Sequence, residues 1–382
     1  MEPNAHHYEL PTLSLSEREA RWARVRGEME HAGLDCLLAY SGGNSLNALY
    51  LTQIDMEGLA MFPLQGDPVF LLPSGERWLH WAQGSQTWVP DVRPVRELAS
   101  PAGEALEQAG ARRVGLVDLK GLGTGAHAAL MTAISDYETE DASQLVYNLR
   151  MVKSEEELAM MERAAAAADQ AIAALRSTAR AGVRENELYA ELYRVLLAGG
   201  CEPATGISME ATPRPFHPVR KPSLRSLQEG DVVMAHLNPR YGGYFGHPHV
   251  CLTIGEPRAE IRAMFQVCEE AFETFKAAAR PGATLGDACR KTLGVIERAG
   301  YEWRKEPLVH SIGLAQNEPP NGGIPSNPYP DLELRENQTF GLHPWVGRMA
   351  DGIGIDSGRA VRITGEGAVP FGGLPRVELY RA

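Results

Sequence analysis

The order of the elements in the second half of this sequence constrains its fold more than any single motif does. Helical spacing of apolar residues predicts four helices there, at residues 155–179, 184–199, 260–280 and 284–299. Short apolar runs predict strands after each helix pair, at residues 231–237, 250–254, 339–343 and 353–363. The second half therefore repeats one unit, two helices and then strands, and this duplication indicates an α+β domain.

A helix start marks the boundary between this part and the residues before it. Ser154 is followed three residues later by Glu157, which is the pattern of a capping box, and the acidic first turn suits the positive end of the helix dipole. Before that point, helical and strand periods alternate, which is typical of an α/β domain. Because 382 residues exceed what one hydrophobic core usually supports, we predict a smaller domain at 1–150 and a larger one at 151–382.

The composition limits which partners the protein can bind and where in the cell we expect it. A net charge of −12 argues against a nucleic-acid partner, which would require a basic face. No stretch approaches the roughly 18 consecutive apolar residues of a membrane span, and no apolar run follows a basic start at the N-terminus. The five cysteines are dispersed without a CxxC pair, which is typical of reduced thiols. We therefore expect a cytoplasmic protein without a membrane or nucleic-acid partner.

Histidines supply the main candidates for chemistry, because neutral imidazole binds transition metals and titrates near neutral pH. The candidates in the second half, with one aspartate on the last predicted strand pair, are His217, His236, His247, His249, His310, His343 and Asp356. His247 and His249 are two residues apart on a predicted strand, so they face the same side. A lone histidine in a strand is nevertheless more often structural, and none of the familiar zinc spacings is present. The spacing alone leaves both interpretations open.

Several short motifs follow one another in the order found in a known superfamily. They cover residues 149–157, 181–188, 230–233, 243–244, 310–313 and 318–319. In these motifs the chain resembles creatinase, aminopeptidase P, prolidase and methionine aminopeptidase, and the resemblance extends over the whole chain. It implies a C-terminal pita-bread domain with a curved antiparallel sheet, preceded by a smaller α/β creatinase-type N-terminal domain. It also implies a homodimer.

The resemblance further implies a metal site. The peptidases of this superfamily use two Asp, one His and two Glu, and those positions fall here on His236, His247, His310, His343 and Asp356. Only His310 keeps the family residue. With so few carboxylates, two close divalent ions are hard to neutralise, so the substitutions favour one divalent transition metal, such as Fe, Zn or Mn. The alternative is that metal binding was abandoned, as in creatinase.

The resemblance to creatinase also suggests the catalytic groups. The loop around His217 is similar to the one that carries the catalytic histidine of creatinase, and His249 falls on the creatinase glutamate that contacts substrate. We predict both as acid/base residues. Tyr244, Trp345 and Arg348 are predicted to line the substrate pocket. The competing interpretation of Trp345 is simple packing beside the strand. The competing interpretation of Arg348 is a solvated position in a loop.

The function implied by these features is metal-dependent hydrolysis of a C–N bond in a small non-peptide molecule, since most of the superfamily cleaves such bonds. A lyase acting on a small zwitterion and non-haem metal redox or oxygenase chemistry are alternatives. A metal-free, creatinase-type amidinohydrolase is another. A catalytically inactive binding protein is the alternative of a different class, although such members usually lose residues that ligate metal.

Overall fold

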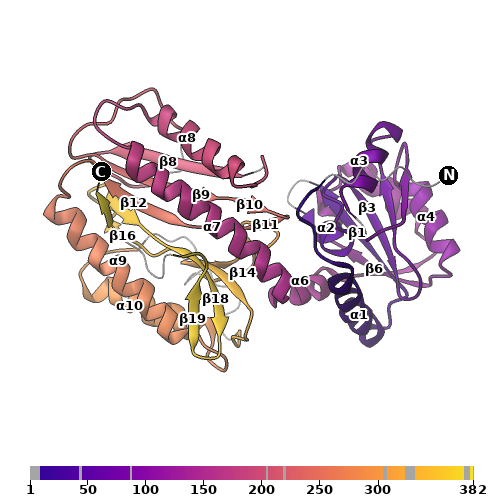
Figure 1. The fold of residues 1–382 in the computed structure, drawn as a ribbon. Helices are drawn as coiled ribbons and strands as arrows, with labels where there is room; N and C mark the ends of the chain where they lie inside the picture. Colours follow the sequence, from indigo (N-terminus) through magenta and orange to yellow (C-terminus); the bar gives the residue numbers. More distant parts are fainter. Residues whose placement is uncertain are drawn as a thin grey trace. The chain divides into compact units, whose positions relative to one another are not determined.

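The capping box predicted at Ser154 begins the second of two compact units, Met1–Arg150 and Met151–Ala382 (Figure 1). The structure is a computed structural model. It describes residues 9–42, 45–86, 88–203, 205–217, 221–303, 308–322, 332–373 and 379–381. No helix among these residues is long and apolar enough to cross a membrane.

The first unit is built around a mixed seven-stranded sheet of order β5-β4-β3-β1-β6-β7, with β2 paired to β1. Its strands are β1 (Cys36–Gly42), β2 (Ser45–Leu46), β3 (Gly58–Pro63), β4 (Val69–Leu72), β5 (Asp91–Pro94), β6 (Arg113–Val117) and β7 (Glu138–Asp141). Its helices are α1 (Leu15–Ala32), α2 (Asn47–Thr52), α3 (Leu79–Gly84), α4 (Ala99–Gln108), α5 (Thr124–Ala133) and α6 (Ser143–Met151), with short 3-10 turns η1 (Glu76–Trp78) and η2 (Leu119–Gly121). The apolar run at residues 34–40 predicts a buried strand, and the structure forms β1 there, which pairs antiparallel with β3 and parallel with β6.

The second unit contains two helix pairs and two main sheets. The helices are α7 (Glu155–Thr178), α8 (Glu185–Ala198), α9 (Ala259–Ala278) and α10 (Leu285–Arg298). One sheet has the order β20-β12-β9-β8, formed by β8 (Gly206–Thr212), β9 (Val232–Asn238), β12 (His249–Thr253) and β20 (Leu379–Arg381). The other has the order β14-β13-β15-β18-β19, formed by β13 (Val309–Ser311), β14 (Glu318–Gly322), β15 (Thr339–Leu342), β18 (Arg359–Thr364) and β19 (Gly367–Pro370). Two-stranded ribbons are formed by β10 (Arg240–Tyr241) with β11 (Tyr244–Phe245), and by β16 (Trp345–Arg348) with β17 (Ile353–Asp356).

Each half of this unit packs its own helix pair against its own strands. In Figure 1, α7 and α8 lie beside β8 and β9, whereas α9 and α10 lie beside the C-terminal strands. Side chains alternate along β9, so Val233, Ala235 and Leu237 join the core of α7 and α8. His236 therefore lies on the other face of β9, the face that Met234 contributes to the core of α9 and α10. The duplication predicted from the sequence thus becomes two layers, with the histidines on the side where the halves meet.

The prediction of strand structure over residues 353–363 was wrong in one respect, because two separate strands form there. β17 ends at Asp356 and β18 begins at Arg359 in a different sheet. Between them, Gly358 exchanges two backbone hydrogen bonds with His249 and so joins the two halves of the unit. A Cβ at Gly358 would lie 2.0 Å from the carbonyl oxygen of Leu342, so only glycine allows this close approach.

Ser154→Ala is expected to lower the free energy of unfolding of the second unit by about 1 kcal/mol, because it removes the acceptor for the Glu157 amide. Urea unfolding followed by circular dichroism measures this change. Ser177→Ala near the end of the same helix is the control, and its effect should be smaller. Equal losses in the two variants would contradict the assignment of Ser154 as the helix cap.

Candidate metal centre

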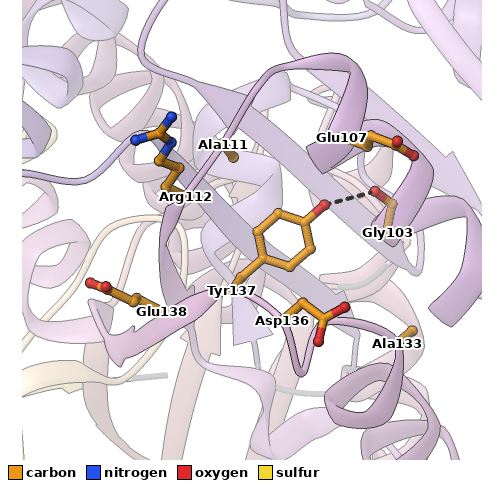
Figure 2. Close-up of a pocket in the computed structure, with 8 residues that line it drawn as sticks. All are labelled: Gly103, Glu107, Ala111, Arg112, Ala133, Asp136, Tyr137 and Glu138. Atoms are coloured by element: carbon orange, nitrogen blue, oxygen red, sulfur yellow. Dashed lines mark hydrogen bonds between the residues drawn. The ribbon is translucent and has the colours of Figure 1, made fainter.

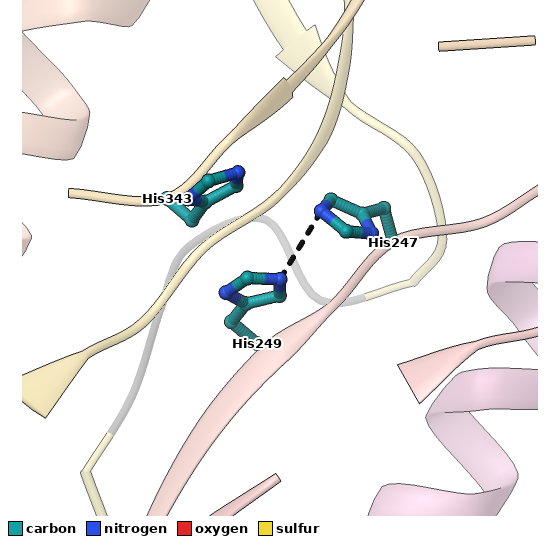
Figure 3. Close-up of side chains that lie close together, drawn as sticks. All are labelled: His247, His249 and His343. Carbon is teal, nitrogen blue, oxygen red and sulfur yellow. Dashed lines mark hydrogen bonds between the residues drawn. The ribbon is translucent and has the colours of Figure 1, made fainter. Parts of the chain in front are cut away.

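Strand register brings the first two histidines together. β9 and β12 pair antiparallel with His236 opposite His249, and their rings stack with centroids 3.4 Å apart and planes 11° apart. His247, just before β12, is on the same side as His249, and their Nε2 atoms are 3.1 Å apart. His310 comes from β13 in the other sheet, and its Nε2 lies 3.2 Å from Nε2 of His247. His343, after β15, stacks on His249 with ring centroids 4.4 Å apart (Figure 3).

Hydrogen-bond acceptors hold the outer nitrogens of two of these rings. Nδ1 of His247 lies 2.6 Å from Oδ1 of Asn238, and Nδ1 of His310 lies 3.2 Å from the carbonyl oxygen of Ser311. Amide and carbonyl oxygens only accept, so both Nδ1 atoms carry the hydrogen. In a neutral imidazole the Nε2 atom then presents a lone pair. The Nε2 lone pairs of His247 and His310 therefore lie 3.2 Å apart with no hydrogen between them.

Asp356 organises the opposite edge of the cluster. Its Oδ1 lies 2.9 Å from Nε2 of His236, and its Oδ2 lies 3.4 Å from Nδ1 of His249. An anionic carboxylate on that side favours hydrogen on Nδ1 of His249, which turns the lone pair of its Nε2 toward His247. Burial opposes ionisation of Asp356, but the adjacent His236 and His249 hold its pKa well below its usual range.

Burial keeps the central imidazoles neutral. It lowers the pKa of His249 to about 3, with the neighbouring His236 adding to the effect, and lowers the pKa of His310 to about 4. Burial and then the neighbouring imidazoles hold the pKa of His247 and of His343 well below the usual value. At neutral pH these four imidazoles are therefore uncharged nitrogen donors near one carboxylate, which is the form that ligates metal.

Two groups of three side chains offer ligand atoms within 4.8 Å of one another, and they share His249. One is His247, His249 and His343, and the other is His236, His249 and Asp356. The second group is the poorer site, because His236 and His249 lie face to face. One ion shared between rings stacked at 3.4 Å would sit about 1.7 Å out of each ring plane, whereas an imidazole lone pair lies in its plane.

The first group, extended by His310, fits an ion. At the usual distance of about 2.0–2.1 Å from each nitrogen, ligand angles of roughly 90–110° require nitrogens roughly 2.9–3.4 Å apart. The measured separations, 3.1 and 3.2 Å, fall in this range. The planes of His247 and His249 are 62° apart, and those of His247 and His310 are 72° apart, so these pairs are not stacked. The rings of His249 and His343 are stacked, with planes 18° apart, so the three histidines that suit one ion together are His247, His249 and His310. The donor set suits a borderline transition metal.

His217 lies beside the cluster, whereas Tyr244 and Arg348 are held by carboxylates elsewhere in this unit. The ring of His217 stands edge-on to His236 with centroids 5.8 Å apart. The hydroxyl of Tyr244 donates to Glu157 over 2.7 Å, so Tyr244 lies against the start of α7. Arg348 pairs with Glu260 and Asp351.

Trp345 is almost fully buried, and its indole nitrogen donates to the carbonyl oxygen of Phe216, over 2.8 Å. These contacts favour the packing interpretation of Trp345. The motif that suggested His217 continues into Pro218 and Val219, which lie outside the described residues.

Two residues of the site escaped the sequence analysis. Asn238 fixes the orientation of His247, and its only signal was a position two residues after His236 on the same strand. Gly341 on β15 faces the cluster, because a Cβ there would lie 2.7 Å from Cδ2 of His247 and 2.7 Å from Cε1 of His310. Nothing in the local sequence distinguishes this glycine.

A separate hollow of about 580 Å³ lies in the first unit (Figure 2). Its lining includes Glu107, Arg112, Asp136, Tyr137 and Glu138, and Tyr137 donates to the carbonyl oxygen of Gly103 over 3.4 Å. None of the residues predicted for the site lines it. The histidine cluster is therefore the candidate centre.

Sequence comparison assigns the fold and the family. The sequence profile of metallopeptidase family M24 matches residues 159–369, and that of the creatinase/prolidase N-terminal domain matches residues 21–152. The chain belongs to family M24. The predicted superfamily and the predicted two-part fold are thereby confirmed.

Solved structures and curated relatives agree with this family. The X-Pro aminopeptidase from Thermotoga maritima superposes with a TM-score of 0.82 at 21% identity, over 94% of this chain and 99% of that one. The Xaa-Pro dipeptidase from Bacillus anthracis gives 0.82 at 22%, over 96% and 100%. The Xaa-Pro dipeptidase of Lactobacillus delbrueckii subsp. lactis is 27% identical over 60% of this chain, a match that spans 62% of that relative's length.

Gly341→Ala is expected to weaken metal binding by about tenfold or more, because its Cβ would displace the rings of His247 and His310. Competition with a chelator of known affinity measures the change. Gly365→Ala is the control, since no atom lies within 4 Å of the added Cβ. Unchanged affinity in Gly341→Ala would show that these two rings do not take part in binding.

Proposed function

We propose that this chain is a hydrolase that holds one divalent transition metal with His247, His249 and His310, beside His343, and cleaves a C–N bond in a small non-peptide molecule. One observation carries the proposal: His247 and His310 meet through two lone pairs at 3.2 Å while their Nδ1 atoms are occupied. Such a contact is repulsive unless a cation lies between the nitrogens. The assignment departs from the roles expected from the sequence: His249 becomes a ligand, whereas Asp356 and the His236 ring hydrogen-bonded to it lie outside the ligand set.

The charge of the cluster supports one ion. The superfamily's five positions usually carry four carboxylates, whereas here Asp356 is the single carboxylate among them. Two divalent ions beside one buried carboxylate would leave several uncompensated positive charges in a site that is almost closed to water, and burying an unpaired charge is costly. With one divalent ion, much less positive charge is left uncompensated. Of the metals expected from the sequence, imidazole donors with little carboxylate suit Fe or Zn better than Mn, which prefers oxygen ligands.

The chain's own groups supply the remaining chemistry. A divalent ion at this position would supply Lewis-acid polarisation of a substrate oxygen or a water nucleophile at neutral pH. His217 stands outside the ligand set, is half-buried and lies at the edge of the cluster, so it suits proton transfer to the leaving nitrogen. Asp356 is hydrogen-bonded to Nε2 of His236 and lies 3.4 Å from Nδ1 of His249, so its charge favours one orientation of each ring.

A small substrate suits this site. His247, His249 and His310 are each less than 5% exposed, which leaves little surface for a long peptide to reach them. Relatives carry the name Xaa-Pro dipeptidase, but their usual carboxylate ligand set is largely absent here, so we propose a non-peptide substrate. The homodimer and the cytoplasmic location stay predictions.

Protein purified without chelator is expected to contain one transition-metal ion per chain, measured by plasma mass spectrometry. His247→Ala should lose this ion, because His247 contacts both His249 and His310. His127→Ala, an exposed histidine of the first unit, is the matched control and should retain it. Two ions per chain, or an ion retained in His247→Ala, would contradict the proposed centre.

The metal-loaded protein should hydrolyse a compound from a panel of small amides, ureas and guanidines faster than it hydrolyses Xaa-Pro dipeptides. His217→Ala should keep the ion but lose about 10²–10⁴-fold in turnover, the usual contribution of a general acid or base. Efficient cleavage of Xaa-Pro dipeptides would overturn the non-peptide substrate. Oxygen consumption by an iron-loaded protein would replace hydrolysis by redox chemistry.

A further inference from the structure

The loop that carries His217 is held by a buried carboxylate. Glu210 on β8 is 8% exposed, and its Oε1 accepts hydrogen bonds from the backbone amides of Phe216, over 2.7 Å, and of His217, over 3.1 Å. Hydrogen bonds to an ionised acceptor are stronger than neutral ones. One carboxylate oxygen therefore fixes the backbone at the catalytic candidate itself.

The β16–β17 ribbon holds the same loop from another direction. The indole nitrogen of Trp345 donates to the carbonyl oxygen of Phe216 over 2.8 Å, and the two rings meet edge to face with centroids 5.4 Å apart. The amide of Gly354 donates to the carbonyl oxygen of Pro215 over 2.8 Å. Trp345 is 5% exposed, so its ring is committed to this contact and does not present a face for substrate stacking.

The same ribbon is also connected to the histidine cluster at both of its ends. Trp345 begins β16 two residues after His343, and β17 ends at Asp356, which is paired with Trp345 across the ribbon. The ribbon that carries Asp356 therefore also fixes the position of the His217 loop through its contacts with Phe216 and Pro215. We propose that Trp345 and Glu210 are positioning residues, a clamp that holds His217 at the edge of the histidine cluster.

The role of the clamp rests on the proposed function of His217 as the acid/base. A proton-transfer group must lie within hydrogen-bond reach of the reacting atom, and small displacements are costly in rate. Two contacts from separate elements restrict the loop more than either does alone. The clamp gives a physical reason for a buried tryptophan and a buried glutamate whose hydrogen bonds meet on this loop.

Amide hydrogen exchange tests the clamp without a substrate. Trp345→Phe keeps an aromatic ring but removes the indole donor to Phe216. We expect the amides of Phe216 and His217, which bond to Glu210 and not to Trp345, to exchange about five-fold faster, the effect of one net hydrogen bond. The nuclear magnetic resonance signal of the His217 imidazole, assigned with His217→Gln, should shift in the same variant. A purely structural tryptophan would speed exchange in β9 as well.

Matched variants separate the possible outcomes. Trp303→Phe, a half-buried tryptophan packed on the core of α9 and α10, should leave both amides and the His217 signal unchanged. Glu210→Gln keeps an acceptor oxygen and should protect the amides better than Glu210→Ala does. Unchanged exchange at Phe216 and His217 in Trp345→Phe would overturn the clamp. That failure is distinct from failure of the metal centre, because exchange is measured whether or not the protein binds an ion.

Discussion

The proposed metal site depends on the close contact between the imidazoles of His247 and His310. Each ring gives its Nδ1 hydrogen to a fixed acceptor, Asn238 in one case and the Ser311 carbonyl in the other. Their Nε2 atoms are left facing each other at 3.2 Å, with His249 at 3.1 Å from His247 on the neighbouring side. Uncharged donors brought this close in a buried place need a cation, and their spacing matches two ligands of one ion.

The architecture explains how such donors come together from distant parts of the chain. His249 reaches the cluster through the pairing of β9 with β12, and His310 through the pairing of β13 with β15 in the other half. The backbone exchange between His249 and Gly358 joins these halves directly behind the site. In the superfamily, mainly carboxylates occupy this junction. Replacing them by imidazoles changes the charge that the junction can neutralise, and hence the number of ions it suits.

Much of this could be predicted from the sequence, because local pattern determines it. The capping box at Ser154 and the apolar strand in the first unit depend on neighbouring residues alone, and the duplication of helix pairs depends on their order. The family resemblance correctly indicated the fold. It indicated positions that the fold brings close together, but not which nitrogen of each ring faces inward. That choice depends on strand register and on acceptors such as Asn238, which are set by long-range packing. For the same reason the closeness of Gly341 to two rings had no sequence signature, and the strand predicted over residues 353–363 concealed a change of sheet at Gly358.

An anomalous difference map from crystals of the protein purified without chelator, collected at the absorption edge of the metal it contains, tests the central claim most directly. The account predicts one peak per chain, bounded by the Nε2 atoms of His247 and its neighbouring histidines, with Asp356 outside the ligand shell on the far edge of His249. Two peaks, or a single peak ligated by Asp356 and His236, would contradict it.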